Sequence, residues 1–192
     1  MTVPTVPSGA AGREKILNAA LYLFSRKGFA ATTTKEISSR AGVAAGLLFY
    51  HFKTKREILD AILAERSLEE HFAEIVHSIP TAEPTAAMVD LSFTILGELR
   101  SRIEVVRVAF HAWLSESEGA DELTKLAERA RQLLATFIER VYGTGGEEGH
   151  ARHAATAELL FSVLVMHSLL ADAQTDRDFV RRIVEDIVAP RL

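Results

Sequence analysis

The residues with the clearest chemical meaning lie in the stretch AGVAAGLLFYHFKTKREIL, residues 41–59. Small residues come first, then the aromatic run FYHF, and then three positive charges at Lys53, Lys55 and Arg56. Small residues let a backbone approach the edges of bases, whereas lysines and hydroxyl groups bind phosphate. This order of residue types therefore predicts a surface that contacts duplex nucleic acid.

Phosphate contacts are expected from cationic and hydroxyl side chains near the ends of short helices. Thr33 and Glu36 have the spacing of a capping box, which would begin a helix at Thr34 and direct free backbone N–H groups toward an anion. The predicted phosphate contacts are Thr33, Thr34, Lys35, Tyr50, His51, Lys53 and Lys55. Each residue alone could be an ordinary packed or solvated side chain, and it is their order and spacing that favour nucleic-acid binding.

Base contacts are expected from the exposed start of the second short helix. The candidates are Ala44, Ala45, Gly46 and Leu47. Alanine and leucine can contact thymine methyl groups but cannot form the bidentate hydrogen bonds that distinguish guanine or adenine. We therefore expect much of the sequence preference to come from DNA shape or from Lys35. Phe49 and Phe52 are expected to pack in the core against the first helix.

Charge is segregated along the chain. Residues 1–56 contain nine Lys and Arg against two acidic residues, a net charge of +7, whereas residues 57–192 carry −11. A basic segment followed by an acidic one predicts a polyanionic partner for the first segment only. Chance clustering on a solvated face is the alternative.

Several classes of protein are not expected. The chain has no cysteine, which excludes disulfides and thiolate metal sites, and His150 and His153 lack a third ligand, so no metal site and no cofactor are predicted. No nucleophile elbow, phosphate-binding glycine loop or zinc signature is present, so an enzyme is not expected. The apolar stretch 154–171 is interrupted by Glu158 and predicts a buried helix, with no membrane partner and a cytoplasmic location.

The hydrophobic pattern predicts an all-α fold. Nine helices are expected, at about residues 11–27, 34–41, 44–52, 54–78, 85–99, 103–114, 121–142, 147–171 and 176–189. Gly42 separates two short helices, as in a helix-turn-helix unit. We expect a flexible lead over residues 1–12, a three-helix helix-turn-helix domain over 13–56 and a second helical domain over 57–192.

The segment TTTKEISSRAGVAAGLLFYHFKTKREIL, residues 32–59, resembles the signature of TetR-family transcriptional regulators. The resemblance implies a homodimer that binds a palindromic operator, usually as a repressor, and is released by a small effector, which we expect to be apolar. Polar residues are usual in the family where this chain has Ala44, Ala45 and Leu47, and Phe49 replaces a usual tyrosine. The alternative is a helical module that senses a ligand or partner and has lost sequence-specific DNA binding.

By the same resemblance, residues 57–192 form a domain for ligand binding and dimerisation. A pocket would be lined by Phe93, Arg107, Phe110, His111, Trp113, Phe137 and His167, with core packing as the alternative for each. The last two helices are expected to form a four-helix bundle with a second copy, or else to close the monomer's own core. Their interface residues would be Ala155, Leu159, Val163, Met166, Leu170, Phe179, Ile183 and Ile187. A ligand would shift the long helix 54–78 and so change the spacing of the two recognition helices.

Overall fold

The structure is a computed structural model that describes residues 9–66, 69–80, 82–114, 120–170 and 177–188, and every regular element in these ranges is helical. The elements are α1 (Gly9–Lys27), α2 (Thr34–Ala41), α3 (Ala45–His51), α4 (Lys55–Glu65), α5 (Glu69–Ser78), α6 (Pro84–Ser101), α7 (Ile103–Leu114), α8 (Ala120–Tyr142), α9 (Gly146–Leu170), α10 (Arg177–Ile183) and the π-helical turn η1 (Val184–Val188). The all-α prediction is confirmed. The described ranges hold ten helices and a π-helical turn in place of the nine helices expected.

The chain divides into two compact units, and α7 contributes to both. The first unit comprises Met1–Ser67 and Arg107–Ala120, and the second comprises Leu68–Val106 and Asp121–Leu192. Because the division falls between Val106 and Arg107, the first turn of α7 belongs to the second unit and the rest of the helix to the first. The units are therefore not two consecutive stretches of chain, and a domain boundary after residue 56 stays a prediction.

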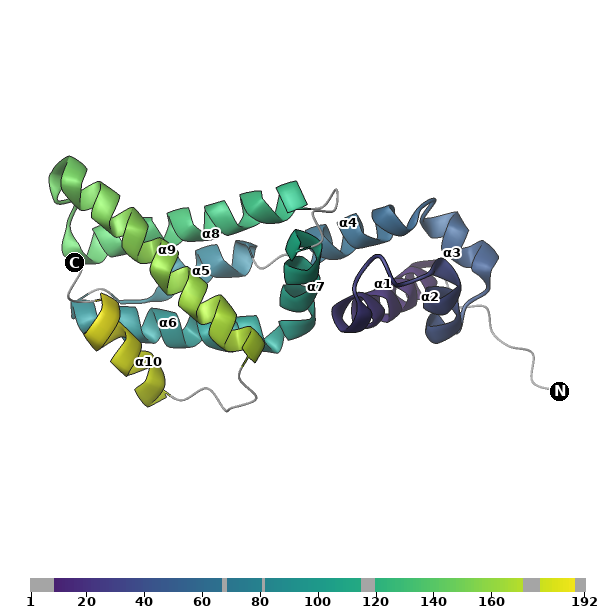
Figure 1. Ribbon diagram of the computed structural model, residues 1–192, viewed down its shortest axis with the longest axis horizontal. Coiled ribbons are helices and arrows are strands. Elements are labelled where there is room, and N and C mark those ends of the chain that lie inside the picture. The colour runs from purple at the N-terminus through teal and green to yellow at the C-terminus, as the bar shows by residue number, and fades with distance from the viewer. Residues whose placement is uncertain (1–8, 67–68, 81, 115–119, 171–176, 189–192) are drawn as a thin grey trace. The chain divides into compact units, whose positions relative to one another are not determined.

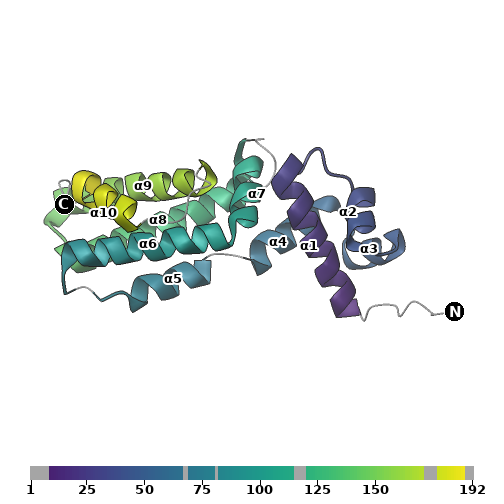
Figure 2. The same ribbon diagram turned by 90° about the horizontal axis from the view of Figure 1, so that it is seen from below.

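Four helices build the core of the first unit (Figures 1 and 2). α1 contacts α2, α3 and α4, and its side chains Ile16, Ala20 and Phe24 are fully buried. Ile37 of α2 and Leu48 of α3 are buried as well. Apolar burial of this kind, about 25 cal/mol per Å² of apolar surface, is what holds the two short helices onto α1.

The turn between α2 and α3 depends on Gly42. Its φ angle of 65° lies in the left-handed region, where a residue without a Cβ atom meets no steric clash. Its N–H donates to the carbonyl of Ser39 at 3.2 Å, and the N–H of Val43 donates to the carbonyl of Ser38 at 3.0 Å. This pair of bonds is a Schellman motif, which ends α2 and lets α3 begin four residues later.

The prediction of one helix over residues 54–78 is wrong. α4 ends at Glu65 with Arg66 as its C-cap, and α5 is a separate helix. The apolar side chains of α4, such as Ile62, are buried in the first unit, whereas Phe72 of α5 is buried in the core of the second. In the sequence, Glu65 and Arg66 lie between these two sets of apolar residues, and both form ion pairs with α1. The two helices therefore belong to different cores.

The core of the second unit surrounds α6, which contacts α5, α9 and α10 (Figure 1). Leu91 and Ile95 of α6 are fully buried, and α8 adds Phe137. The helix expected over 176–189 changes its winding, since α10 ends at Ile183 and a π-helical turn follows. Three valines spaced by four residues, Val180, Val184 and Val188, are buried along this last segment.

α9 carries apolar residues on two sides, and the described residues bury only one of these sides. Among the described residues it is the one helix long and apolar enough to span a membrane by length and composition, and 33% of its most apolar window is buried. Glu158, near its middle, pairs with Arg131 of α8 at 2.9 Å. The expectation of a buried helix is thus correct for one face only, because Met166 and Leu170 on the other face are 42% and 76% exposed.

Candidate nucleic-acid interface

The short helix α3 divides its residues between two faces. Leu48 is buried, and Phe52, the C-cap, is 4% exposed. At 3.6 residues per turn, the exposed residues share one side of the helix. They are Ala45, Gly46, Phe49 and Tyr50, and we call them the outer face of α3. Ala44, the N-cap, is also exposed and makes no side-chain cap.

Leu47 and His51 lie on the opposite side of α3, against α1. A Cβ atom added at Gly12 would lie 3.0 Å from Cδ2 of Leu47 and 3.8 Å from Nε2 of His51. Nε2 of His51 is buried and makes no hydrogen bond with the described residues. Leu47 is half-buried and packs toward α1, so its place in the base-reading set stays a prediction. Nε2 of His51 is buried, so this nitrogen is not accessible to a phosphate.

Phe49 departs from its predicted place in the core. It is 47% exposed, whereas Phe52 is buried beneath the guanidinium of Arg13, whose carbon lies 5.2 Å from the ring centroid. Tyr50 is 75% exposed, and its ring meets the ring of His51 edge-on at 5.1 Å. The accessible aromatic side chains on α3 are therefore Phe49 and Tyr50.

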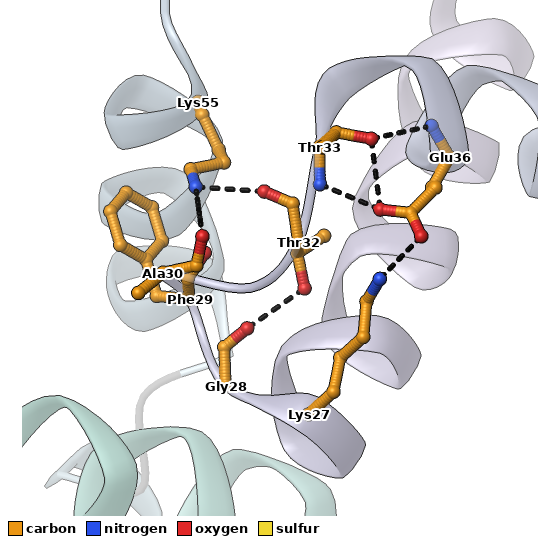
Figure 3. A network of polar contacts seen from close by, with 8 residues as sticks. All are labelled: Lys27, Gly28, Phe29, Ala30, Thr32, Thr33, Glu36 and Lys55. Atoms are coloured by element: carbon orange, nitrogen blue, oxygen red, sulfur yellow. Dashed lines mark hydrogen bonds and ion pairs between the residues drawn. The ribbon is translucent and has the colours of Figure 1, made fainter.

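The predicted capping box begins α2 (Figure 3). Oγ1 of Thr33 accepts the N–H of Glu36 at 3.2 Å, and the N–H of Thr33 donates to Oε2 of Glu36 at 2.9 Å. The hydrogen bond from Lys27, followed by those from Thr33, lowers the pKa of Glu36 to about 2. Thr34 is half-buried and Lys35 is exposed in the first turn. This turn therefore has a capped backbone and one exposed cation, Lys35.

Lys55 is half-buried and is bound by the loop between α1 and α2. Its Nζ donates to the carbonyls of Phe29 and Thr32, each at 2.7 Å, and to that of Ala30 at 3.4 Å (Figure 3). It also lies 4.3 Å from the centroid of the Phe29 ring, and burial lowers the pKa of Lys55. An ammonium group has three N–H donors, and all three are directed to the α1–α2 loop. The predicted phosphate contact is therefore revised to a structural contact.

The start of α4 leaves a different lysine accessible. Oγ1 of Thr54 accepts the N–H of Glu57 at 3.1 Å, and the carboxylate of Glu57 accepts the backbone N–H of Lys53 at 2.8 Å. The side chain of Lys53 is exposed. The outer face of α3 is therefore followed in the sequence by the exposed cation Lys53, whose backbone N–H is held by Glu57.

Ion pairs that the sequence analysis missed join the ends of α1 and α4. Arg13 donates to both carboxylate oxygens of Glu65, with Nη1 to Oε2 at 2.8 Å. Arg66 pairs with Glu14 and donates to Oδ1 of Asn18 at 2.9 Å. The partners are 48 to 52 positions apart, so no local pattern indicates them. They hold the carboxyl end of α4 on the first three turns of α1.

The predicted pocket residues fall into different units. Arg107, Phe110 and His111 lie in the first unit, and Phe93, Phe137 and His167 lie in the second. Phe137 is fully buried, which agrees with the core-packing alternative. His167 stacks on Phe179 with ring centroids 4.1 Å apart, and burial, with a smaller effect of Arg100, lowers the pKa of His167. The side chain of Trp113 lies outside the described part of the structure.

The predicted interface residues on α9 share its outward face. Ala155, Met166 and Leu170 are exposed, and Leu159 and Val163 are half-buried. On α10, Phe179 and Ile183 are half-buried and pack against the core of the second unit. The side chain of Ile187 lies outside the described residues. The outward face of α9 is therefore an apolar surface that the described residues of the second unit leave uncovered.

Known proteins share both the N-terminal sequence and the whole fold. Residues 16–62 match the family model described as bacterial regulatory proteins, tetR family. The chain is 29% identical over 161 residues to the transcriptional repressor KstR2 of Rhodococcus jostii, covering 82% of this chain and 76% of the relative.

Two solved structures show how far the fold extends. A transcriptional regulator from Aquifex aeolicus has a TM-score of 0.70 at 18% identity and covers 91% of this chain and 96% of its own. The multidrug binding protein EbrR, solved with malachite green, has a TM-score of 0.63 at 20% identity over 92% and 97% of the two chains. With the helix-turn-helix geometry and the family match at residues 16–62, the chain belongs to the TetR family and is a DNA-binding transcriptional regulator.

Proposed function

We propose that this regulator is a repressor that binds a palindromic operator as a homodimer, acts in the cytoplasm and is released by a small apolar effector. The observation that carries the DNA contact is the outer face of α3, which is accessible and lies between two exposed cations in the sequence. Lys35 in the first turn of α2 and Lys53 after α3 supply positive charge for the phosphates, and Tyr50 adds a hydroxyl group.

The homodimer is supported by the outward face of α9. Its five apolar residues are exposed or half-buried, and an uncovered apolar surface of this length is typical of an interface. A second copy would bury the same face of its own α9 in a two-fold arrangement. Each dimer would then present two copies of α3, and two half-sites of opposite orientation would make the operator palindromic.

Two observations support release by an effector: the similarity to known regulators and the division of the chain into two compact units. The neighbour EbrR was solved with malachite green, a small molecule, and KstR2 is named a repressor. We place the effector site in the second unit. Because α4 ends at Glu65, the signal does not pass along one uninterrupted helix from residue 54 to 78, as the sequence suggested. Binding would change the spacing of the recognition helices, which must be roughly 34–36 Å apart to enter successive major grooves.

A selection from a random duplex library with the purified protein tests this function. The expected sites are inverted repeats, and affinity for them should fall steeply as salt rises. Lys53→Gln should weaken binding to all sequences about evenly and reduce the salt slope by about one. A dimeric protein that retains no duplex at low salt would instead support the ligand-sensing or partner-sensing module.

A further inference from the structure

The outer face of α3 has almost no hydrogen-bonding side chains. Ala45, Gly46 and Phe49 offer none, and the hydroxyl group of Tyr50 is the one polar group on this face. Guanine and adenine are distinguished in the major groove by side chains that form paired hydrogen bonds, such as arginine, asparagine or glutamine. The outer face carries none of these types, so it cannot read bases in that way.

Phe49 is the large apolar group on this face. It is 47% exposed and is followed by Tyr50, which is 75% exposed, so two aromatic rings are accessible on this seven-residue helix. Ala45 lies one turn before it on the same side, and Gly46 adds no side chain that would hold the backbone away. A partner that fits must supply apolar surface to the ring and negative charge to the exposed cations Lys35 and Lys53.

Duplex DNA meets both requirements at thymine. Each A·T pair places a C5-methyl group in the major groove, and alanine and phenylalanine side chains contact such methyl groups. We propose that the outer face of α3 reads thymine methyl groups, with the ring of Phe49 as the contacting group. This inference rests on the proposed operator binding and names the chemistry that specifies the operator.

The test uses the operator selected by the full-length protein and replaces each thymine in turn by deoxyuridine. This change removes one methyl group and leaves every hydrogen-bonding group in place. Burial of one methyl group corresponds to about a fourfold change in affinity. We expect one thymine in each half-site to show this loss with the wild-type protein. With Phe49→Ala the same replacement should have no effect, since the ring that covers the methyl group is gone.

Matched variants separate this contact from general binding. Phe49→Tyr keeps the ring and should keep the discrimination between thymine and uracil. Tyr50→Phe should lower affinity for both duplexes and leave their ratio unchanged. Circular dichroism melts of all variants establish that each is folded, which the exposure of both side chains leads us to expect.

The outcomes distinguish failure of thymine reading by Phe49 from failure of the proposed operator binding. If the wild-type protein binds no duplex at low salt, the proposed function fails. If it binds a selected operator but deoxyuridine has no effect, or has the same effect on wild type and Phe49→Ala, thymine reading by Phe49 is refuted while operator binding stands. A selected operator with no common thymine in its half-sites would refute it as well.

Discussion

Replacement of Lys55 by methionine tests the assignment of this residue to a structural contact with the α1–α2 loop. Methionine keeps an unbranched apolar stem of similar length and removes the ammonium group. The carbonyls of Phe29 and Thr32 then lose donors at 2.7 Å. An unsatisfied buried carbonyl costs about 1–3 kcal/mol, and the loop is only partly buried, so water replaces part of the loss.

We expect a destabilisation of about 1–2 kcal/mol, which for a chain of this length lowers Tm by roughly 2–8 °C. Lys53→Met is the matched control. Lys53 lies two residues before Lys55, carries the same charge and has an exposed side chain. Thermal melts by circular dichroism should show a clear loss for Lys55→Met and almost none for Lys53→Met.

Operator binding gives the second readout for the same pair of variants. A lysine that contacts phosphate contributes about one unit to the slope of log affinity against log salt. Lys53→Met should therefore lower the slope, whereas Lys55→Met should leave it unchanged and affect affinity only through the position of α2. An unchanged Tm together with a lower slope for Lys55→Met would refute our reasoning and return Lys55 to the phosphate contacts.

Three further predictions concern stability and assembly. The lowered pKa of Glu36 means that its contribution is present above pH 4.5 and is lost as pH falls toward 2, so urea melts of wild type and Glu36→Gln should converge over that window. Gly12→Val should crowd Leu47 and lower stability by about 1–3 kcal/mol in the same assay. Met166→Glu should produce monomers in sedimentation, while Ala154→Glu, away from the outward face of α9, should not; equal behaviour of these two would exclude that face from the interface.

The sequence predicted those parts of the fold that local signals determine. The capping box at Thr33, the glycine turn at Gly42 and the bounds of α2 agree with the structure because each depends on residues within one or two helical turns. The exposed positions of Ala44 and Tyr50 follow from the same short-range pattern. Secondary structure set by caps and turns is therefore accessible without knowledge of tertiary contacts.

The remaining differences arise from contacts between distant positions. Leu47 and His51 turn toward α1 because Gly12, far earlier in the chain, leaves room for them. Lys55 is bound by a loop 23 to 26 residues earlier. The end of α4 at Glu65 has no glycine or proline to mark it, and it reflects ion pairs with α1 and the division of apolar residues between two cores. No periodicity within one segment contains this information.

The uncovered apolar face of α9 has a consequence for dosage. If two chains pair through this face, as we propose, the active species is a product of two chains. At expression levels below the dissociation constant of the pair, the amount of assembled regulator would then grow with the square of the chain concentration. By mass action, halving the synthesis of the chain would then remove about three quarters of the assembled dimer. A cell that holds this protein near that threshold would obtain a steep genetic response from small changes in its abundance.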